Sequence, residues 1–194
     1  MTLPPTIASH SRRSLLRSVG LSAPAVALLV GVSSPAHAQG SKGVDSQDVD
    51  VLNEILGTEH EGISAYQTLM EGGLLLRPQH GLARLIQSHH KTHRDFLAGT
   101  INRLGGAPVA AKSDKEYATD LNIHQVKNQY GALTLAIMLE QGAANAYLDM
   151  LPSIKDGELS KAAARVAADE VMHWTALRGV QRQELPSEAM SFGI

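Results

Sequence analysis

The chain has 194 residues, of which 43% are hydrophobic, 17 are basic, 19 are acidic and none is cysteine. This composition is typical of a one-domain globular protein, and it excludes disulfide frameworks, thiolate metal sites and cysteine nucleophiles, so any metal must bind through His, Asp or Glu. The balanced charge and the 4% of aromatic residues provide neither a basic excess nor stacking platforms, and therefore disfavour nucleic-acid binding.

The N-terminal segment has the pattern of an export signal. Arg12 and Arg13 precede an apolar run over 21–32, and small residues before position 39 suit a signal peptidase. A membrane anchor is the alternative, but Pro24 interrupts the run, which is too short for a bilayer core of roughly 30 Å. The paired arginines resemble a twin-arginine signal over 1–38, which implies export of the folded protein, most simply to the periplasm, with no stable membrane anchor after cleavage.

Residues 39–48 are small and polar, and we expect a flexible lead-in that ends near a helix cap at Ser46 or Asp48. Apolar residues then recur at three- and four-residue spacing in four stretches, which predicts four amphipathic helices. The stripes are Leu52, Ile55, Leu56, Ile63, Tyr66 and Met70; Leu82, Leu85, Ile86, Leu97, Ile101 and Leu104; Leu133, Ile137, Ala144, Tyr147 and Leu151; and Val166, Leu177 and Val180. Since no stretch alternates as a half-buried strand does, the expected fold class is all-α.

Glycine and proline residues mark the predicted helix ends. They are Gly72-Gly73 after the first helix, Pro78 before the second, Gly105-Gly106 after it, Pro152 after the third and Pro186 after the fourth. The connections are short within each pair of helices and long over about 105–126. We therefore expect an up-down-down-up four-helix bundle over 49–183, made of two antiparallel hairpins joined by a long crossover, and a C-terminal tail over 184–194.

Six polar side chains stand on the apolar stripes. They are Glu59 on the first, His90 and His93 on the second, Glu140 on the third, and Glu170 and His173 on the fourth. Buried carboxylates are costly unless they are paired with cations. Helical rise places all four sets at one level, roughly 17–21 Å from the adjoining turns. Carboxylates and imidazoles gathered at one level suit iron, manganese or zinc.

An internal repeat relates the two predicted hairpins. Residues 59–66 (EHEGISAY) match 140–147 (EQGAANAY) at an offset of 81, and residues 90–93 (HKTH) match 170–173 (EVMH) at an offset of 80. Two equivalent half-sites that face one another are what a dinuclear metal centre requires.

With these motifs, the chain over about 49–183 resembles the ferritin-like superfamily of bacterioferritins and rubrerythrins, in particular its exported twin-arginine members. In that family, helices one and three each supply a glutamate, and helices two and four each supply a Glu-x-x-His pair. The resemblance implies the metal ligands Glu59, His93, Glu140, Glu170 and His173, with Tyr66 and Tyr147 behind them. His90 is the departure, because it stands where the family has a bridging glutamate.

This departure changes the charge of the centre. Four glutamates balance two divalent ions, whereas three leave about one positive charge that a bound anion must offset, and a single ion leaves about one negative charge. The sequence leaves three roles open for His90: a ligand to one of two ions, a ligand in a mononuclear site, or the mark of a site that has lost its function. A metal-free network of buried Glu–His ion pairs is the alternative for the whole set.

The remaining histidines and large side chains are interpreted as structural or solvated. His60, Glu61 and His89 fall off the stripes and are expected at the surface, with a role for His60 and His89 in metal entry or behind the metal ligands left open. Solvated positions are also expected for His80 and His124. Packing roles are expected for Trp174, which could also make a subunit contact, and for Met70, Met138, Met150 and Met172.

These observations favour an exported ferritin-like protein with one or two iron or manganese ions per chain, zinc being a further candidate. An oxidase, peroxide-scavenging or metal-handling role with oxygen or peroxide would follow. The alternative is a metal-free helical bundle that acts in envelope stress or binds a partner. A storage cage is less expected, since about ten residues follow the fourth helix, whereas a homo-oligomer stays open.

Overall fold

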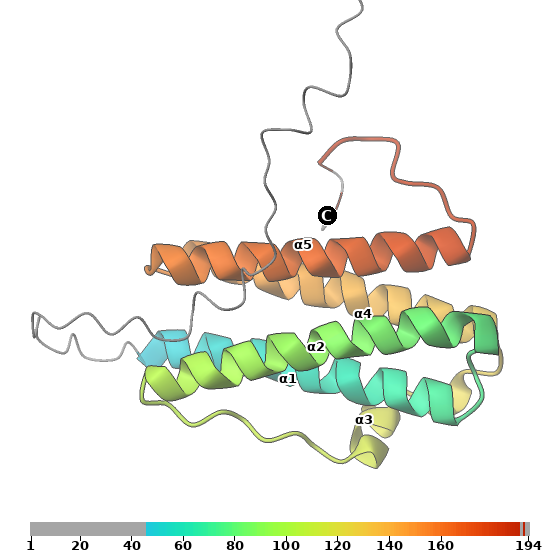
Figure 1. Cartoon of the computed structure of the whole chain (residues 1–194), viewed down its shortest axis with the longest axis horizontal. Helices are drawn as coiled ribbons and strands as arrows, with labels where there is room; N and C mark the ends of the chain where they lie inside the picture. Colours follow the sequence, from blue (N-terminus) through green and yellow to red (C-terminus); the bar gives the residue numbers. More distant parts are fainter. Residues whose placement is uncertain (1–45, 191, 193–194) are drawn as a thin grey trace, which may run out of the picture. The chain divides into compact units, whose positions relative to one another are not determined.

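The computed structural model describes residues 46–190 and residue 192. Four long helices form the bundle: α1 (Ser46–Glu71), α2 (Arg77–Arg103), α4 (Gln129–Met150) and α5 (Gly157–Val180). Helix α1 packs along α2, and α4 packs along α5 (Figure 1). The expected all-α bundle of four long helices is therefore confirmed. The predicted signal peptide over 1–38 lies outside the described residues, and α1 begins inside the expected lead-in.

Local sequence explains where the helices begin and end. Pro78 lies in the first turn of α2, where no backbone N–H is needed. Asn128 and Asp156 cap α4 and α5, because each side chain accepts a backbone N–H of the first turn, at 3.0 and 2.7 Å. Gly73 and Gly105 follow α1 and α2 with φ angles of +66° and +79°, a conformation that glycine adopts without strain.

The crossover between α2 and α4 contains more structure than its sequence indicated. It holds α3 (Asp114–Asp120) and a 3₁₀ turn, η2 (Ile123–Gln125), and a second 3₁₀ turn, η3 (Leu151–Ser153), follows α4. Helix α3 packs against α1, and the Ser64 hydroxyl donates to Asp114 at 2.6 Å. Asn53 fixes the segment that precedes α3, since its side-chain amide donates to the backbone oxygen of Ala107 at 3.1 Å and its side-chain oxygen accepts from the backbone N–H of Val109 at 2.7 Å.

The apolar core consists of two clusters that lie toward opposite ends of the bundle. One contains Leu69, Ile86, Leu133 and Trp174 among its buried members. The other contains Leu56, Leu97, Met150 and Val166 among its members. Residues of the four long helices that fall between these clusters in sequence occupy the middle of the bundle, and this is where the polar residues of the stripes lie.

Four packing predictions are wrong. Leu85 is 53% exposed, Met138 is 63% exposed, Met172 is 59% exposed and Val180 is 36% exposed. Each lies at the edge of an apolar stripe, and the helix turns its side chain away from the neighbouring helices. Within residues 46–190 and 192, no helix combines the length and apolar character that a membrane crossing requires.

Candidate metal centre

The structure brings all six polar stripe residues together in the middle of the bundle. The carboxylates Glu59, Glu140 and Glu170 are 0% exposed. His90 is 2% exposed, and the other two imidazoles, His93 and His173, are 5% exposed. We call these six residues the Glu–His cluster. Each of the four long helices contributes to it, so its geometry depends on the packing of the whole bundle.

The ring of His90 connects the two glutamates that come from α1 and α4. Its Nδ1 lies 2.7 Å from Glu59 Oε2, and its Nε2 lies 3.2 Å from Glu140 Oε1. Its Nδ1 is also 3.7 Å from Glu170 Oε1. Each nitrogen of this one ring therefore faces a different half of the cluster.

The carboxylate of Glu170 connects the other two histidines in the same manner. Its Oε1 lies 2.9 Å from His93 Nδ1, and its Oε2 lies 3.1 Å from His173 Nδ1. His173 Nδ1 also lies 2.9 Å from Glu140 Oε2, and His93 Nδ1 lies 3.7 Å from Glu59 Oε1. His90 and Glu170, which the repeat relates at an offset of 80, thus both link the two halves.

Two overlapping sets of four donors result from this arrangement. One consists of Glu59, His90, His93 and Glu170, and the other of His90, Glu140, Glu170 and His173; in each set the donor atoms lie within 4.8 Å of one another. The sets share His90 and Glu170. This is the layout of two adjacent half-sites with two linking residues.

Two tyrosines cross between α1 and α4. The hydroxyl of Tyr66 donates to Glu140 Oε1, and that of Tyr147 donates to Glu59 Oε1, each at 2.5 Å. Because residue 66 meets 140 while 59 meets 147, α1 and α4 run in opposite directions. Burial and the adjacent carboxylate raise the pKa of both tyrosines well above the usual value. They therefore stay protonated and act as donors that hold the carboxylates in place.

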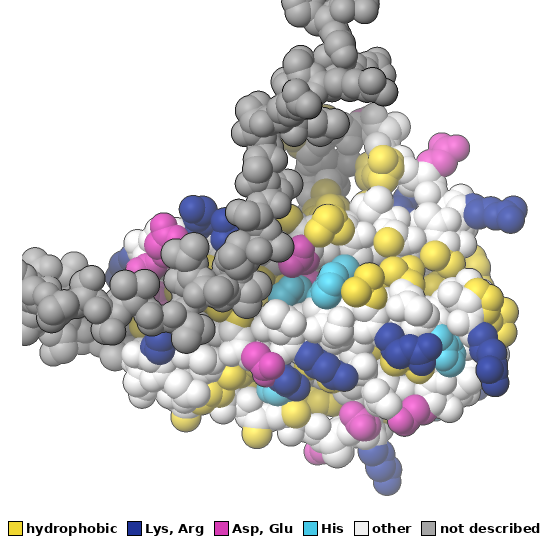
Figure 2. All heavy atoms as spheres, in the orientation of Figure 1, with side chains coloured by type: hydrophobic (Ala, Val, Ile, Leu, Met, Phe, Trp, Pro, Cys, Tyr) yellow, Lys and Arg dark blue, Asp and Glu magenta, His cyan; other side chains and the backbone are white. Residues whose placement is uncertain are grey.

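Two residues contact the histidines of the cluster from outside. The sequence left such a role open for His89 and did not indicate it for Asp169. Asp169 Oδ2 lies 3.3 Å from His93 Nε2, and His89 Nδ1 lies 2.8 Å from His173 Nε2. His89 is half-buried, so its expected solvated position is wrong, whereas the alternative of a role at the centre is consistent with this contact. Imidazole and acidic side chains reach the surface on the face formed by α2 and α5 (Figure 2).

The internal repeat could have indicated His89 and Asp169, because positions 89 and 169 are also related by the offset of 80. Each directly precedes the four-residue motif of its own helix, 90–93 or 170–173, and contacts a histidine of the opposite helix. A partner on the far nitrogen fixes the ring and directs Nδ1 into the cluster.

Opposite charges stabilise the cluster without metal. Burial raises the pKa of Glu59, but His90 and His93 lower it by more, and the pKa of Glu140 falls below its usual range through His173 and His90. Burial lowers the pKa of the histidines, but the carboxylates outweigh this effect, so that the pKa of His93 rises to about 10 and that of His173 to about 9. The pKa of His90 is also raised well above its usual value, by Glu140 and Glu59.

The donor set fits a metal ion. His93 Nδ1 and Glu170 Oε1 are 2.9 Å apart, yet neither has hydrogen-bond geometry to any partner among the described residues. Two donors on one ion, each at about 2.1 Å and at right angles, would lie about 3 Å apart. The fit is therefore to a hard or borderline ion held by carboxylate oxygen and imidazole nitrogen.

The other residues considered from sequence lie outside the cluster. His60 contacts the backbone oxygen of Val109 at 3.2 Å, and His80 that of Leu75 at 2.9 Å, so neither is simply solvated. His124 is exposed. Trp174 is buried and packs edge-on against Phe192, with ring centroids 5.1 Å apart, so the packing interpretation of this residue agrees with its position.

The comparisons with known proteins agree with the bundle architecture. The chain is similar to a crystal structure of a conserved hypothetical protein, rv2844, from Mycobacterium tuberculosis, with a TM-score of 0.61 and 21% identity, over 76% of this chain and 99% of that one. At this identity the likeness concerns the fold alone. No curated protein matches the chain. The ferritin-like domain family matches residues 47–183, which hold all four long helices and the whole Glu–His cluster, and the chain belongs to that family.

Proposed function

We propose that this protein binds one or two iron or manganese ions in the Glu–His cluster and uses them to handle metal or to consume oxygen or peroxide. One observation carries the proposal: two buried four-donor sets share His90 and Glu170. The paired arginines and the apolar run near the N-terminus further support export through the twin-arginine pathway, after the folded bundle has taken up its metal.

The roles of the chain's own residues follow from their contacts. Glu59 and His93 belong to one half-site, Glu140 and His173 belong to the other, and Glu170 reaches both. Tyr66 and Tyr147 hold the α1 and α4 carboxylates by hydrogen bonds, and the two core clusters exclude water above and below. A bound iron or manganese ion would supply the change of oxidation state that side chains lack.

Elemental analysis tests this proposal directly. The protein should be isolated from its exporting cell without chelators or metal-affinity columns, and should contain one or two iron or manganese ions per chain. Glu170→Gln and His93→Ala should abolish tight binding while far-UV helicity is kept. Glu61→Gln is the matched control, because Glu61 is a half-buried carboxylate on α1 outside both donor sets. Wild-type affinity in Glu170→Gln would show that the assignment is wrong.

A metal-free function is the second candidate, and it is supported by the equal numbers of carboxyl groups and imidazoles in the Glu–His cluster. The cluster holds three carboxyl groups and three imidazoles, and the carboxylates raise the pKa of each imidazole, so Glu–His ion pairs offset the buried charges without any metal ion. The two candidates differ in thermal stability, because a metal that binds only the folded state raises the melting temperature with its concentration. No shift with added iron, manganese or zinc under anaerobic conditions would favour a bundle that acts through its surface.

A further inference from the structure

A cavity of about 220 Å³ opens in the groove between α1 and α4 and ends on the ring of His90. Its walls come from Thr58, Gly62, Met138, Gly142 and Ala143, among others. We call it the His90 cavity. Among the cavities described in residues 46–190 and 192, it is the one whose lining includes a residue of the Glu–His cluster.

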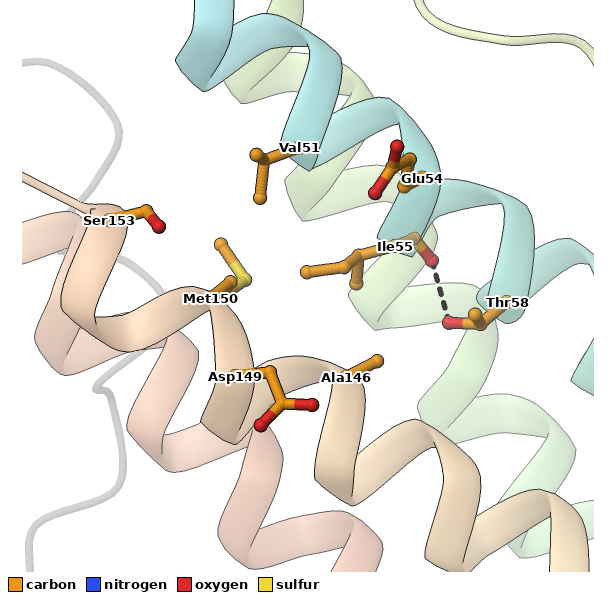
Figure 3. A pocket seen from close by; sticks show the side chains of 8 residues that line it. All are labelled: Val51, Glu54, Ile55, Thr58, Ala146, Asp149, Met150 and Ser153. Carbon is orange, nitrogen blue, oxygen red and sulfur yellow. Dashed lines mark hydrogen bonds between the residues drawn. The ribbon is translucent and has the colours of Figure 1, made fainter.

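A second cavity in the same groove provides a comparison. It measures about 410 Å³ and is lined by Ile55, Ala146 and Met150 among others, and it shares Thr58 with the His90 cavity. Figure 3 shows Val51, Ile55 and Met150 directed toward the space between the two helices. No residue of the Glu–His cluster lines this larger cavity, so it serves as an internal control for effects on the groove.

Two glycines create the His90 cavity. A Cβ atom at Gly62 would lie only 3.2 Å from Cε1 and Nε2 of His90, so the missing side chain lets the ring approach the surface of α1. A Cβ atom at Gly142 would meet nothing within 4 Å, so the space beside α4 is open. The internal repeat pairs Gly62 with Ala143 and Glu61 with Gly142, which places small residues on both sides of the groove.

The character of the walls selects the ligand. A water molecule occupies about 30 Å³ in the liquid, so a cavity of about 220 Å³ has room for roughly seven water molecules and admits small molecules. Most of its lining is apolar, and the Thr58 hydroxyl donates to the backbone oxygen of Ile55 at 2.8 Å. Glu61 at the wall and the three carboxylates behind His90 disfavour anions. The cavity therefore suits a small uncharged molecule.

We infer that the His90 cavity is the route by which an uncharged oxidant of the size of dioxygen or hydrogen peroxide reaches the Glu–His cluster, with His90 the first residue of the cluster that it meets. This inference rests on the proposed function for its chemistry, but not for the presence of the route. It assigns to His90, the residue that departs from the family pattern, a place between the cavity and both half-sites.

The route can be tested in the metal-free protein. Dissolved dioxygen is paramagnetic and accelerates the nuclear relaxation of the groups it contacts. With ¹³C-methyl alanine labelling, the methyl group of Ala143 in the cavity should relax several-fold faster under oxygen than that of the adjacent Ala144, which is 0% exposed and does not line the cavity. Gly142→Leu should fill the cavity and remove this effect, whereas Ala146→Leu, in the neighbouring cavity, should not.

The iron-loaded protein provides a second readout that does not depend on turnover. Anaerobic Fe(II) affinity should be equal in wild type, Gly142→Leu and Ala146→Leu, while nitric oxide, a neutral diatomic probe, should bind the iron several-fold more slowly in Gly142→Leu alone. Fe(II) oxidation with dioxygen and with peroxide then identifies which oxidant uses the route. Equal relaxation of Ala143 and Ala144, or an unchanged nitric oxide rate in Gly142→Leu, would overturn the inference. Failure to bind both iron and manganese would instead refute the proposed function.

Discussion

The contact between Gly62 and His90 predicts an unusual response to a conservative substitution. In Gly62→Ala, the new Cβ would lie 3.2 Å from two ring atoms of His90 and 3.3 Å from a third, whereas carbon atoms prefer about 3.5–4.0 Å. The ring must move by a few tenths of an ångström. It is held at 2.7 Å by Glu59 and at 3.2 Å by Glu140, so this movement strains the centre of the Glu–His cluster.

The two opposing contributions give the expected magnitude. Replacing glycine by alanine inside a helix stabilises it by about 1 kcal/mol, while overpacking a filled core costs about 1–3 kcal/mol. Gly62→Ala should therefore lower the free energy of unfolding by about 0–2 kcal/mol. Gly57→Ala is the matched control on the same helix, because its Cβ meets nothing within 4 Å, and it should raise the free energy of unfolding by about 1 kcal/mol.

Denaturant unfolding of the metal-free variants measures this difference, and side-chain ¹⁵N spectra report the shift of the His90 ring. In a double-mutant cycle, Gly62→Ala should become stabilising once His90→Asn removes the ring. If Gly62→Ala stabilises the wild-type background as much as Gly57→Ala does, the ring is not packed against α1, and both this reasoning and the floor of the His90 cavity are refuted.

The hydroxyls of Tyr66 and Tyr147 make equivalent hydrogen bonds to buried carboxylates, so each Tyr→Phe variant should lose a similar free energy of unfolding, about 1.5–3 kcal/mol, and a much smaller loss in one of them would contradict the symmetry. The pKa of His93 is raised to about 10 from 6.5, so the stability that protonated His93 contributes is complete below pH 6.5 and is lost as pH rises through 10. Unfolding of the protein in chelator should show this loss of stability. Saturating metal should abolish the pH dependence, because an imidazole that binds a metal through Nδ1 carries no proton there. Asp169→Asn and His89→Gln should each weaken metal binding by about 10–100-fold in a competition titration. Unchanged metal affinity in both variants would show that these contacts to His93 and His173 have no role in metal binding.

The repeat and the polar residues made the fold and the centre accessible from sequence. Helix ends followed Gly72-Gly73, Pro78 and Pro152 within a few residues, because these residues restrict the backbone locally. The level of the Glu–His cluster followed from helical rise alone. Charged side chains on four apolar stripes can be buried at low cost only when they pair with one another or bind a common ion. The sequence therefore predicted that these side chains meet.

What the sequence did not show depends on contacts between helices. Helix α3 forms in the crossover with a capping box at Ser113 and Glu116, a local signal, yet its packing on α1 is tertiary. The offset of 80 pairs Leu85 with Arg165, and both are exposed. The repeat therefore indicates an exposed position for Leu85, whereas its apolar side chain alone suggests a buried one. The contact between His89 and His173 depends on how α2 and α5 are rotated about their axes relative to each other. The sequence periodicity of a single helix does not determine this rotation.

The pseudo-symmetry of the bundle is retained between α1 and α4 and broken between α2 and α5. Tyr66 and Tyr147 make matching bonds to opposite glutamates, whereas His90 stands opposite Glu170. His90 contacts two carboxylates, while Glu170 contacts two imidazoles, so the two linking residues are complementary to the groups around them in the metal-free cluster.

Metal binding would have to break the Glu–His ion pairs of the metal-free cluster. Each ion replaces protons on the imidazoles, so uptake should release protons and should be opposed by the ion pairs that it breaks. The backing groups also differ, with a carboxylate, Asp169, behind His93 and an imidazole, His89, behind His173. A carboxylate on the far nitrogen makes a histidine a more basic ligand than an imidazole does. The half-site of Glu59 and His93 should therefore bind its ion first, and stepwise rather than cooperative titration is the expected consequence of the substitution at His90.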